Sequence, residues 1–371
     1  MSLGLGLIGT GFMGKAHALA YRAAEAVFGD VPPVRLARLC DTPVENARRY
    51  ATQFGFDVAT DDWRTLIAAP DVDIVSITTP NALHKEMALA AIAAGKHVHC
   101  EKPLALTIND AEEMEAAART AGVRTMVGYN YIHNPAITHA RRLISEGVIG
   151  KPVHFRGWVD EDYQADPDLP WTWRAKRADA GLGALGDLGC HLVSMSHILM
   201  GEIESLIADT QIIHDTRPLP DGSGRGTVEN EDTASAILRY KTGAQGTVCT
   251  SRSAWGRKNK LDWELHGTKG MLTFSQERLN ELQLYTNDGP KSQQGFRTIL
   301  TGPEHAPYDS FCPAPGHQLG FGDLKTIEVA TFLRAITAGT NALPSFTDAL
   351  EFERIIHAID ISAREGRRVT L

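Results

Sequence analysis

Asp187 and His191 lie four residues apart at the end of a glycine-rich segment, Gly181–His191. If this segment is helical, the two side chains share one face, where the carboxylate can orient the imidazole and raise its basicity. Such a pair suits general-base catalysis. The same spacing also fits an acidic residue near a helix N-terminus above an ordinary buried histidine. The glycines favour the catalytic interpretation, because they let a flat ligand approach the backbone closely.

The tripeptide Glu101-Lys102-Pro103 follows a predicted strand at residues 97–100. Its side chains would therefore lie at the carboxyl end of that strand, the edge at which open α/β sheets bind ligands. Charged residues before a proline are also common in ordinary exposed loops. By itself, the tripeptide leaves a functional site and a plain turn both open.

A glycine-rich turn, Gly9-Thr10-Gly11-Phe12-Met13-Gly14, joins the first predicted strand to the first predicted helix. In this pattern the first glycine permits a tight turn, the second lets a pyrophosphate approach the backbone, and the third allows close packing of helix on strand. The helix N-terminus adds N–H groups and a positive dipole end. The placement predicts a dinucleotide site, with a merely structural turn as the alternative.

Asp41 ends the second predicted strand, where an acid that binds the adenosine ribose is expected. Its carboxylate would accept hydrogen bonds from the ribose hydroxyls and repel a 2′-phosphate. Thr42 and Pro43 bring no positive charge to neutralise that phosphate. Asp41 can also cap the following helix, and the two roles are compatible. We therefore expect NAD to be preferred over NADP.

The elements that position these residues alternate between strands and helices in the first third of the chain. Strands are predicted at residues 5–9, 35–40, 58–59, 74–78, 97–100 and 125–129, and helices at 15–27, 43–54, 63–68, 84–94 and 108–120. This alternation predicts an α/β domain with a doubly wound parallel sheet over residues 1–130.

The pattern changes after about residue 150, where strands follow one another through tight turns. They are predicted at residues 152–159, 204–213, 233–240, 245–251, 261–266, 270–274 and 282–286, with helices near 137–146, 189–200, 325–338 and 347–364. Residues 215–231 and 289–322 are predicted to be long loops. We expect an α+β domain over residues 131–371 with a large, mainly antiparallel open sheet.

Composition excludes several classes of protein. The net charge of −8 and the lack of a basic patch argue against a nucleic-acid or anionic-membrane partner. No apolar run is long enough to span a membrane, and the N-terminus lacks a secretory signal. The five scattered cysteines fit neither a zinc ribbon nor a disulfide framework, which favours the cytoplasm. No group of histidines has metal-ligand spacing, so no metal is expected.

Together these segments resemble the glucose–fructose oxidoreductase/inositol dehydrogenase (Gfo/Idh/MocA) family over nearly the whole chain. The matching segments are Gly9–Gly14, Thr79-Pro80-Asn81 with His84, Glu101-Lys102-Pro103 and the block from Asp187 to His191. The resemblance implies an NAD-binding Rossmann domain and a second domain whose open sheet often builds oligomers. We therefore expect a homodimer or homotetramer.

The resemblance also implies roles for single residues. Lys102 would be the family's catalytic lysine, and Asp187 and His191 its catalytic pair. Trp173 and Arg174 look like a pair that reaches the nicotinamide half of the cofactor. Besides the glycine turn and Asp41, the expected cofactor-binding residues are Thr79, Pro80, Asn81, His84, Glu101, Lys102, Asn130, Trp173 and Arg174.

The expected reaction is oxidation of a secondary hydroxyl of a sugar, anhydrosugar or inositol-like polyol to a ketone. His191 would remove the hydroxyl proton, Lys102 would stabilise the developing alkoxide, and Asp187 would orient His191. The candidate substrate-binding residues are Lys102, Tyr131, His133, Asp160, Asp162, Tyr163, Asp187 and His191.

One departure from the family leaves the substrate open. Many relatives carry arginine after the Tyr129-Asn130-Tyr131 segment, whereas this chain has Ile132 followed by His133. A carbonyl reductase, or a sugar-modifying enzyme that retains its cofactor, is the alternative on the same scaffold. A cofactor sensor without turnover is a further alternative, but such a protein should lack one of the three catalytic polar residues.

Overall fold

The computed structural model describes residues 2–371, which form two compact units. The first unit runs to Asn130 and also includes Gly320–Glu353. The second unit comprises Tyr131–Leu319 and Arg354–Leu371. The sequence analysis assigned residues 320–353 to the second domain, whereas the structure packs them with the first.

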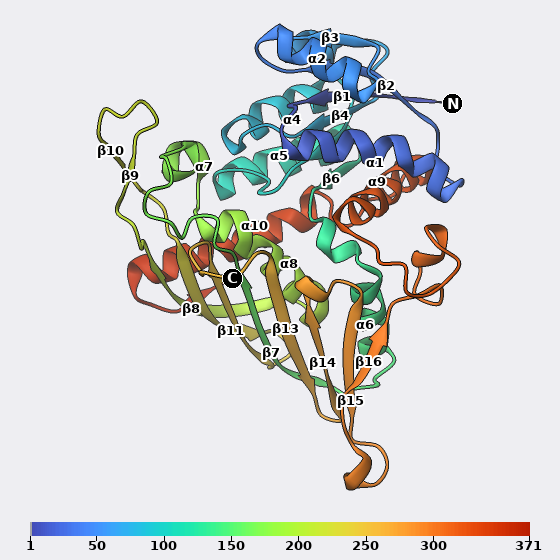
Figure 1. The fold of residues 1–371 in the computed structure, drawn as a ribbon, viewed down its shortest axis with the longest axis vertical. Coiled ribbons are helices and arrows are strands. Elements are labelled where there is room, and N and C mark those ends of the chain that lie inside the picture. The colour runs from blue at the N-terminus through green and yellow to red at the C-terminus, as the bar shows by residue number, and fades with distance from the viewer. Residues whose placement is uncertain (1) are drawn as a thin grey trace. The chain divides into compact units, whose positions relative to one another are not determined.

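A six-stranded parallel sheet forms the centre of the first unit, in the order β3-β2-β1-β4-β5-β6 (Figure 1). The strands are β1 (Leu3–Ile8), β2 (Val34–Cys40), β3 (Val58–Thr60), β4 (Ile74–Ile77), β5 (His97–Cys100) and β6 (Thr125–Val127). Every residue of β4 is buried, as expected for a parallel strand with both faces covered. The predicted doubly wound sheet is thus confirmed.

The helices of this unit connect successive strands. They are α1 (Phe12–Phe28), α2 (Val44–Phe54), α3 (Trp63–Ala68), η1 (Asn81–Leu83), α4 (His84–Ala93) and α5 (Ile108–Ala121). The strand order reverses between β1 and β4, so the carboxyl ends of these two strands flank the switch point at which such sheets bind ligands.

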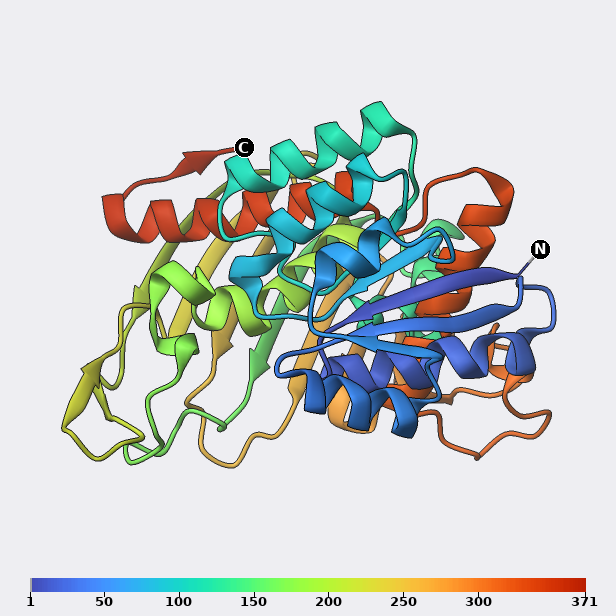
Figure 2. The ribbon, with the colours of Figure 1, turned by 90° about the horizontal axis from the view of Figure 1, so that it is seen from above.

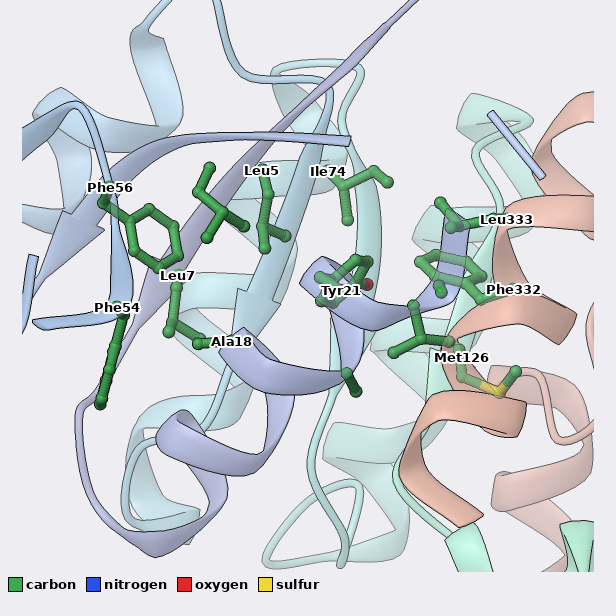
Figure 3. Packing of buried hydrophobic residues seen from close by; sticks show 14 of the residues in the cluster. Leu5, Leu7, Ala18, Tyr21, Phe54, Phe56, Ile74, Met126, Phe332 and Leu333 are labelled. Carbon is green, nitrogen blue, oxygen red and sulfur yellow. The ribbon is translucent and has the colours of Figure 1, made fainter. Parts of the chain in front are cut away.

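Helix α9 (Phe321–Ala338) explains why the later segment belongs to the first unit. Its residues Phe332 and Leu333 are completely buried, and they lie in one apolar cluster with Tyr21 of α1 and Leu5 of β1 (Figure 3). Burying side chains of this size stabilises the fold by about 1.5–3 kcal/mol each. The apolar face of α9 therefore completes the core of the Rossmann-type sheet.

The second unit contains a nine-stranded sheet in the order β16-β15-β14-β13-β7-β12-β11-β8-β17 (Figure 1). The strands are β7 (Pro152–Asp160), β8 (Ile203–Gln211), β11 (Thr233–Tyr240), β12 (Gln245–Ser251), β13 (Lys260–Gly267), β14 (Gly270–Ser275), β15 (Glu281–Thr286), β16 (Arg297–Leu300) and β17 (Val369–Thr370). All neighbours are antiparallel except β7 and β12. The expected, mainly antiparallel sheet is confirmed.

Helices cover one face of this sheet. They include α6 (Pro135–Ser145) and α8 (Cys190–Met200), and α10 (Phe346–Glu365) adds its C-terminal part. The Ser362 hydroxyl of α10 accepts a hydrogen bond from the Ala208 N–H of β8 at 3.0 Å. After α10, the chain ends in β17, which pairs with β8 at the sheet edge (Figure 2). Buried and exposed residues alternate along β11, as expected for a sheet with one covered face.

Two segments predicted to be loops contain strands. Residues 215–231 include β9 (Thr216–Pro218) and β10 (Arg225–Thr227), which form a two-stranded ribbon, and residues 289–322 include β16 at the sheet edge. These strands are only three or four residues long, which is too short to show the repeating pattern that marks a longer strand. Among residues 2–371, no helix is long and apolar enough to cross a membrane.

Candidate active site

The glycine turn between β1 and α1 has the geometry of a pyrophosphate cradle. Gly9 has a φ of +98°, which only glycine adopts readily, and a Cβ at Gly14 would lie 2.2 Å from the Gly9 oxygen. Gly11 faces open space, because a Cβ there would meet nothing within 4 Å. The turn therefore leaves room for a ligand at Gly11 and packs tightly at Gly14.

The N-terminus of α1 is free to bind an anion. Gly11 is its N-cap, and no side chain of the described residues caps this helix end. The first-turn N–H groups thus point toward the space in front of the turn, as a pyrophosphate requires. Thr10 precedes this helix end, Phe12 and Met13 begin the helix, and Phe12 is 72% exposed. These residues fit a bound dinucleotide.

Asp41 lies beside the same turn, directly after β2. The Thr10 hydroxyl donates to one carboxylate oxygen, and the Thr42 N–H donates to the other at 2.6 Å. The capping role is not observed, because α2 has Pro43 as its N-cap and receives no side-chain cap. The carboxylate therefore stands at the end of β2, next to the glycine turn, in the place expected of a ribose-binding acid.

The segment after β4 brings Thr79, Pro80 and Asn81 to the carboxyl edge of the sheet, next to the β1 turn. His84, at the start of α4, is buried, and its ring nitrogens lie 2.9 Å from the Pro103 oxygen and 3.1 Å from the Thr79 oxygen. Burial lowers the pKa of His84, so the ring is neutral and ties this loop to the Lys102 turn.

Lys102 and Asn130 follow β5 and β6 at this edge. Lys102 is half-buried, and its N–H donates to its neighbour Glu101 at 3.2 Å. Asn130 is buried, and its Nδ2 has no hydrogen-bond partner within residues 2–371. A buried donor without an acceptor is costly in a native structure, which fits a bound ligand at this position.

Asp187 belongs to the second unit and lies in a single π-helical turn, η4 (Leu185–Gly189), that runs into α8. π-helical turns are rare in proteins, and those that occur are often found at functional sites. The Tyr163 hydroxyl donates to the Asp187 carboxylate at 2.5 Å, and the Arg174 Nε lies 3.7 Å from the same oxygen. Burial and the Asp187 charge raise the pKa of Tyr163 well above its usual range, so the phenol keeps its proton.

His191 starts α8 in the same unit and is 7% exposed. Its ring packs against Tyr131, with ring centroids 4.6 Å apart. The Tyr131 hydroxyl in turn accepts a hydrogen bond from Asn259 Nδ2 at 3.0 Å. The imidazole is therefore held by an aromatic neighbour that is itself fixed at its polar end.

The other predicted substrate residues occupy different surroundings. Asp160 ends β7, and burial raises the pKa of its carboxyl despite the charges of Arg257 and Lys260. Asp162 is engaged by the loop between β12 and β13, because it accepts from the Lys258 ammonium at 2.6 Å and from the Gly256 N–H at 3.1 Å.

The remaining residues lie in two short helical turns. His133 closes η2 (Asn130–His133), where Ile132 is buried in the apolar core. Trp173 stacks under the Arg174 guanidinium at 4.5 Å in η3 (Trp173–Ala175). The structure thus joins Tyr163 and Arg174 to Asp187 and Tyr131 to His191 within the second unit. Lys102 lies in the first unit.

Sequence reasoning missed several polar residues of these surroundings. Glu231 is buried and accepts from the Leu185 N–H at 3.0 Å, so it holds the π-helical turn, and Asn259 fixes Tyr131. A buried group of His17, His99 and Glu328 lies in the first unit, with potential ligand atoms within 4.8 Å of one another. These contacts join residues far apart in the chain, and no local pattern signals them.

Comparison with protein families gives matches over both units. Residues 3–129 match the model of an oxidoreductase family with an NAD-binding Rossmann fold, and residues 137–273 match the GFO/IDH/MocA C-terminal domain. Levoglucosan dehydrogenase from Pseudarthrobacter phenanthrenivorans is 40% identical over 98% of this chain and 96% of that protein. Inositol 2-dehydrogenase from Rhizobium meliloti is 27% identical over the full length of both chains.

Solved structures show the same likeness. A levoglucosan dehydrogenase in complex with NADH and levoglucosan superposes with a TM-score of 0.97 at 39% identity, covering 100% of this chain and 99% of that chain. The similarity therefore extends over both units of the structure.

Proposed function

This chain belongs to the Gfo/Idh/MocA oxidoreductase family, and from that premise we propose that it is an NAD-dependent dehydrogenase of a sugar, anhydrosugar or inositol-like polyol. Levoglucosan, a 1,6-anhydrosugar, is the substrate that we favour. The observation that carries the proposal is the polar cluster that Tyr163 and Arg174 build on Asp187, four residues before His191, in a chain 40% identical to levoglucosan dehydrogenase.

In the proposed reaction, bound NAD⁺ supplies the acceptor for the hydride. His191 removes the proton of a secondary hydroxyl, and its packing against Tyr131 limits rotation of the ring. Lys102 donates a hydrogen bond to the same oxygen and stabilises the developing alkoxide. General-base catalysis of this kind contributes about 10²–10⁴-fold in rate.

In this proposal, Asp187 assists His191, the general base. Its carboxylate favours the imidazolium that forms when His191 takes the proton. Tyr163 and Arg174 hold the carboxylate from the other side, which keeps it in place through the proton transfer. Tyr131, His133, Asp160, Asp162 and Tyr163 stay candidates for contacts to the sugar hydroxyls.

The cofactor half of the proposal assigns the pyrophosphate to the glycine turn and the adenosine ribose to Asp41. Thr79, Pro80, Asn81, His84 and Asn130 would line the nicotinamide side, and Trp173 and Arg174 are further candidates. Because the Asp41 carboxylate is held by Thr10 and Thr42, neither of which carries a positive charge, we propose that NAD is preferred over NADP.

A substrate panel tests this function. Purified protein with NAD⁺ is given levoglucosan, other anhydrosugars, inositols or aldoses one at a time, and NADH is followed by its absorbance. We expect NADH to accumulate with an anhydrosugar or polyol, and levoglucosan to give the highest kcat/KM. No NADH from any compound would overturn the proposal, and sugar conversion without free NADH would favour the enzyme that retains its cofactor.

A further inference from the structure

A completely buried ammonium group lies behind the Lys102 turn in the first unit. Lys325, on α9, has no exposed side-chain surface, and its Nζ donates to Glu101 at 2.9 Å and to Glu328 at 2.7 Å. Fully buried lysines are rare, because the desolvation of a charge costs several kcal/mol. The charge of Lys325 must therefore be compensated by the groups around it.

Lys325, Glu101 and Glu328 form a buried cluster with two buried histidines, His17 and His99. His17 Nε2 bonds to the same Glu101 oxygen at 2.8 Å, and its Nδ1 bonds to the Ser76 hydroxyl at 2.8 Å. His99 Nε2 lies 2.9 Å from Glu328 and its Nδ1 lies 3.0 Å from the Tyr21 hydroxyl. The cluster thus connects α1, β4, β5 and α9.

The charges in this cluster follow from its contacts. Burial alone would raise the pKa of Glu101, but the Lys325 charge and the His17 hydrogen bond outweigh it and hold that pKa well below its usual range. Burial would lower the pKa of Lys325, yet Glu101 and Glu328 raise it. Burial, with the nearby His99 and Lys325, lowers the pKa of His17 to about 4. At neutral pH the cluster therefore holds an ammonium, an ionised Glu101 and an uncharged His17.

One atom each of His17, His99 and Glu328 could form a metal-ligand set, but these atoms already have hydrogen-bond partners within the protein. Lys325 bonds to the Glu328 oxygen that also contacts His99, and both ring nitrogens of His17 have partners. A buried ion cluster is also weak evidence for stability, because replacing such a cluster by well-packed apolar residues is often neutral or stabilising.

The cluster holds the backbone of the Glu101-Lys102-Pro103 turn, which carries the proposed catalytic lysine. One oxygen of Glu101 is anchored by Lys325 and His17, and the other accepts the Lys102 N–H at 3.2 Å. Gly128 makes room for this carboxylate, because a Cβ there would lie 2.4 Å from Glu101 Oε1. On the far side of the turn, Leu104 N–H donates to the buried Glu353 at 2.7 Å.

We propose that Lys325 and His17 are positioning residues for Lys102: they fix the Glu101 carboxylate, which fixes the Lys102 backbone at the edge of the sheet. Glu101 is then an internal anchor, and its side chain is not a cofactor ligand. This inference rests on the proposed catalytic role of Lys102. It predicts that Lys325 and His17 affect turnover only through Lys102.

The test is a double-mutant cycle on the full-length protein with a sugar that it oxidises. Lys325→Met should lower kcat by roughly 10- to 100-fold, as expected for a catalytic group displaced by about 1 Å, while the Kd for NADH stays within about threefold. In the Lys102→Ala background the same change should cost less than about twofold, since the group that it positions is absent. The matched control is Arg334→Met. Arg334 lies on α9, like Lys325, but forms a surface ion pair with Asp30, so its replacement should leave kcat unchanged.

A second variant guards against misfolding of Lys325→Met. His17→Leu removes an uncharged anchor of Glu101 and should show the same pattern. A kcat equal to that of the control in both variants, or a loss that is fully additive with Lys102→Ala, would overturn the inference. Near-normal turnover in Lys102→Ala would instead overturn the proposed function, so the two failures can be told apart.

Discussion

Two side chains fix the Asp187 carboxylate before any substrate is present. Tyr163 donates a short hydrogen bond to it, and Arg174 places a cation 3.7 Å from the same oxygen. A carboxylate that is already oriented needs little rearrangement when a neighbouring imidazole gains a proton, which is how preorganised electrostatics lower a barrier. Asp187 and Tyr163 therefore act as one unit in the proposed proton transfer.

Asp41 gives a prediction about cofactor choice. Asp41→Ala should weaken NAD binding, because two ribose hydroxyls lose their acceptor, and should improve the use of NADP, because the charge facing a 2′-phosphate disappears. The ratio of kcat/KM for NAD to that for NADP should fall by at least about tenfold, or about 1.4 kcal/mol. Asp57→Ala, which removes a carboxylate of the exposed ion pair with Arg35, is the control. An unaltered enzyme that uses both cofactors equally well would contradict the assignment.

At the residue scale, local sequence reveals a site when neighbouring residues build it. The glycine turn, Asp41 and the Asp187–His191 block are each local, so the sequence alone identifies them as candidates. Lys325 reaches Glu101 across 224 residues and Asn259 reaches Tyr131 across 128, so only the folded chain shows these contacts. A buried lysine also looks like any other charged residue in a helix sequence.

The π-helical turn η4 is the element that presents Asp187, and its backbone is held from behind. Ala184 N–H donates to the Glu231 carbonyl at 2.8 Å, and Leu185 N–H donates to the Glu231 carboxyl at 3.0 Å. Burial raises the pKa of this carboxyl despite these backbone hydrogen bonds. The glycine-rich composition of this segment follows from such close contacts.

Substitution of Gly183 by alanine tests this packing. A Cβ at Gly183 would lie 2.0 Å from the Glu231 oxygen, so Gly183→Ala must displace the backbone that leads into η4. We expect a loss of about 1–3 kcal/mol in the free energy of unfolding, measured by chemical denaturation, together with a fall in kcat. Gly295→Ala, at a position with nothing within 4 Å, should change neither. Equal stability of the two variants would show that η4 is not held in this way.

At the element scale, short apolar runs bounded by turns predicted most strands of the two large sheets. β4, which is buried along its whole length, shows that a parallel strand covered on both faces need not alternate. The strands β9, β10, β16 and β17 escaped prediction, because segments this short show no repeating pattern. The assignment of α9 to the first unit also escaped it. An apolar helix face indicates burial, but it does not say which sheet it covers.

At the scale of the whole molecule, the outer face of the nine-stranded sheet suggests self-association. Ile207 and Ile237 pair across β8 and β11, and they are 37% and 53% exposed. We expect a homodimer or homotetramer in light scattering at micromolar concentration, and Ile237→Glu should shift it toward the monomer, because it would bury a charge. Val58→Glu, on the first unit, is the control. A monomeric wild-type protein would contradict this expectation.

Stability should also depend on pH through Glu353. Burial raises the pKa of Glu353 to about 8 from 4.5, so between these values the native state holds a proton that the unfolded chain has lost. Its contribution to stability is therefore complete below about pH 4.5 and is lost as pH rises through about 8. Glu353→Gln cannot titrate, so its unfolding free energy relative to wild type should increase from pH 5 to pH 8, by at most about 1.4 kcal/mol per pH unit.

Chemical denaturation at several pH values measures this dependence. Glu365→Gln, at the C-terminal end of α10, is the control and is measured at the same pH values. If the difference between Glu353→Gln and wild type were the same at every pH, Glu353 would not be the group that carries the dependence.

The proposed transfer of a sugar hydroxyl proton to His191 is tested by the rate of levoglucosan-dependent NADH formation in wild type and His191→Ala. We expect kcat to fall by about 10²–10⁴-fold in His191→Ala, with NADH binding retained in a fluorescence titration. Asp187→Asn should fall less, because an amide can still hold the ring although it cannot stabilise the imidazolium. Turnover of His191→Ala close to that of wild type would show that His191 is not the general base.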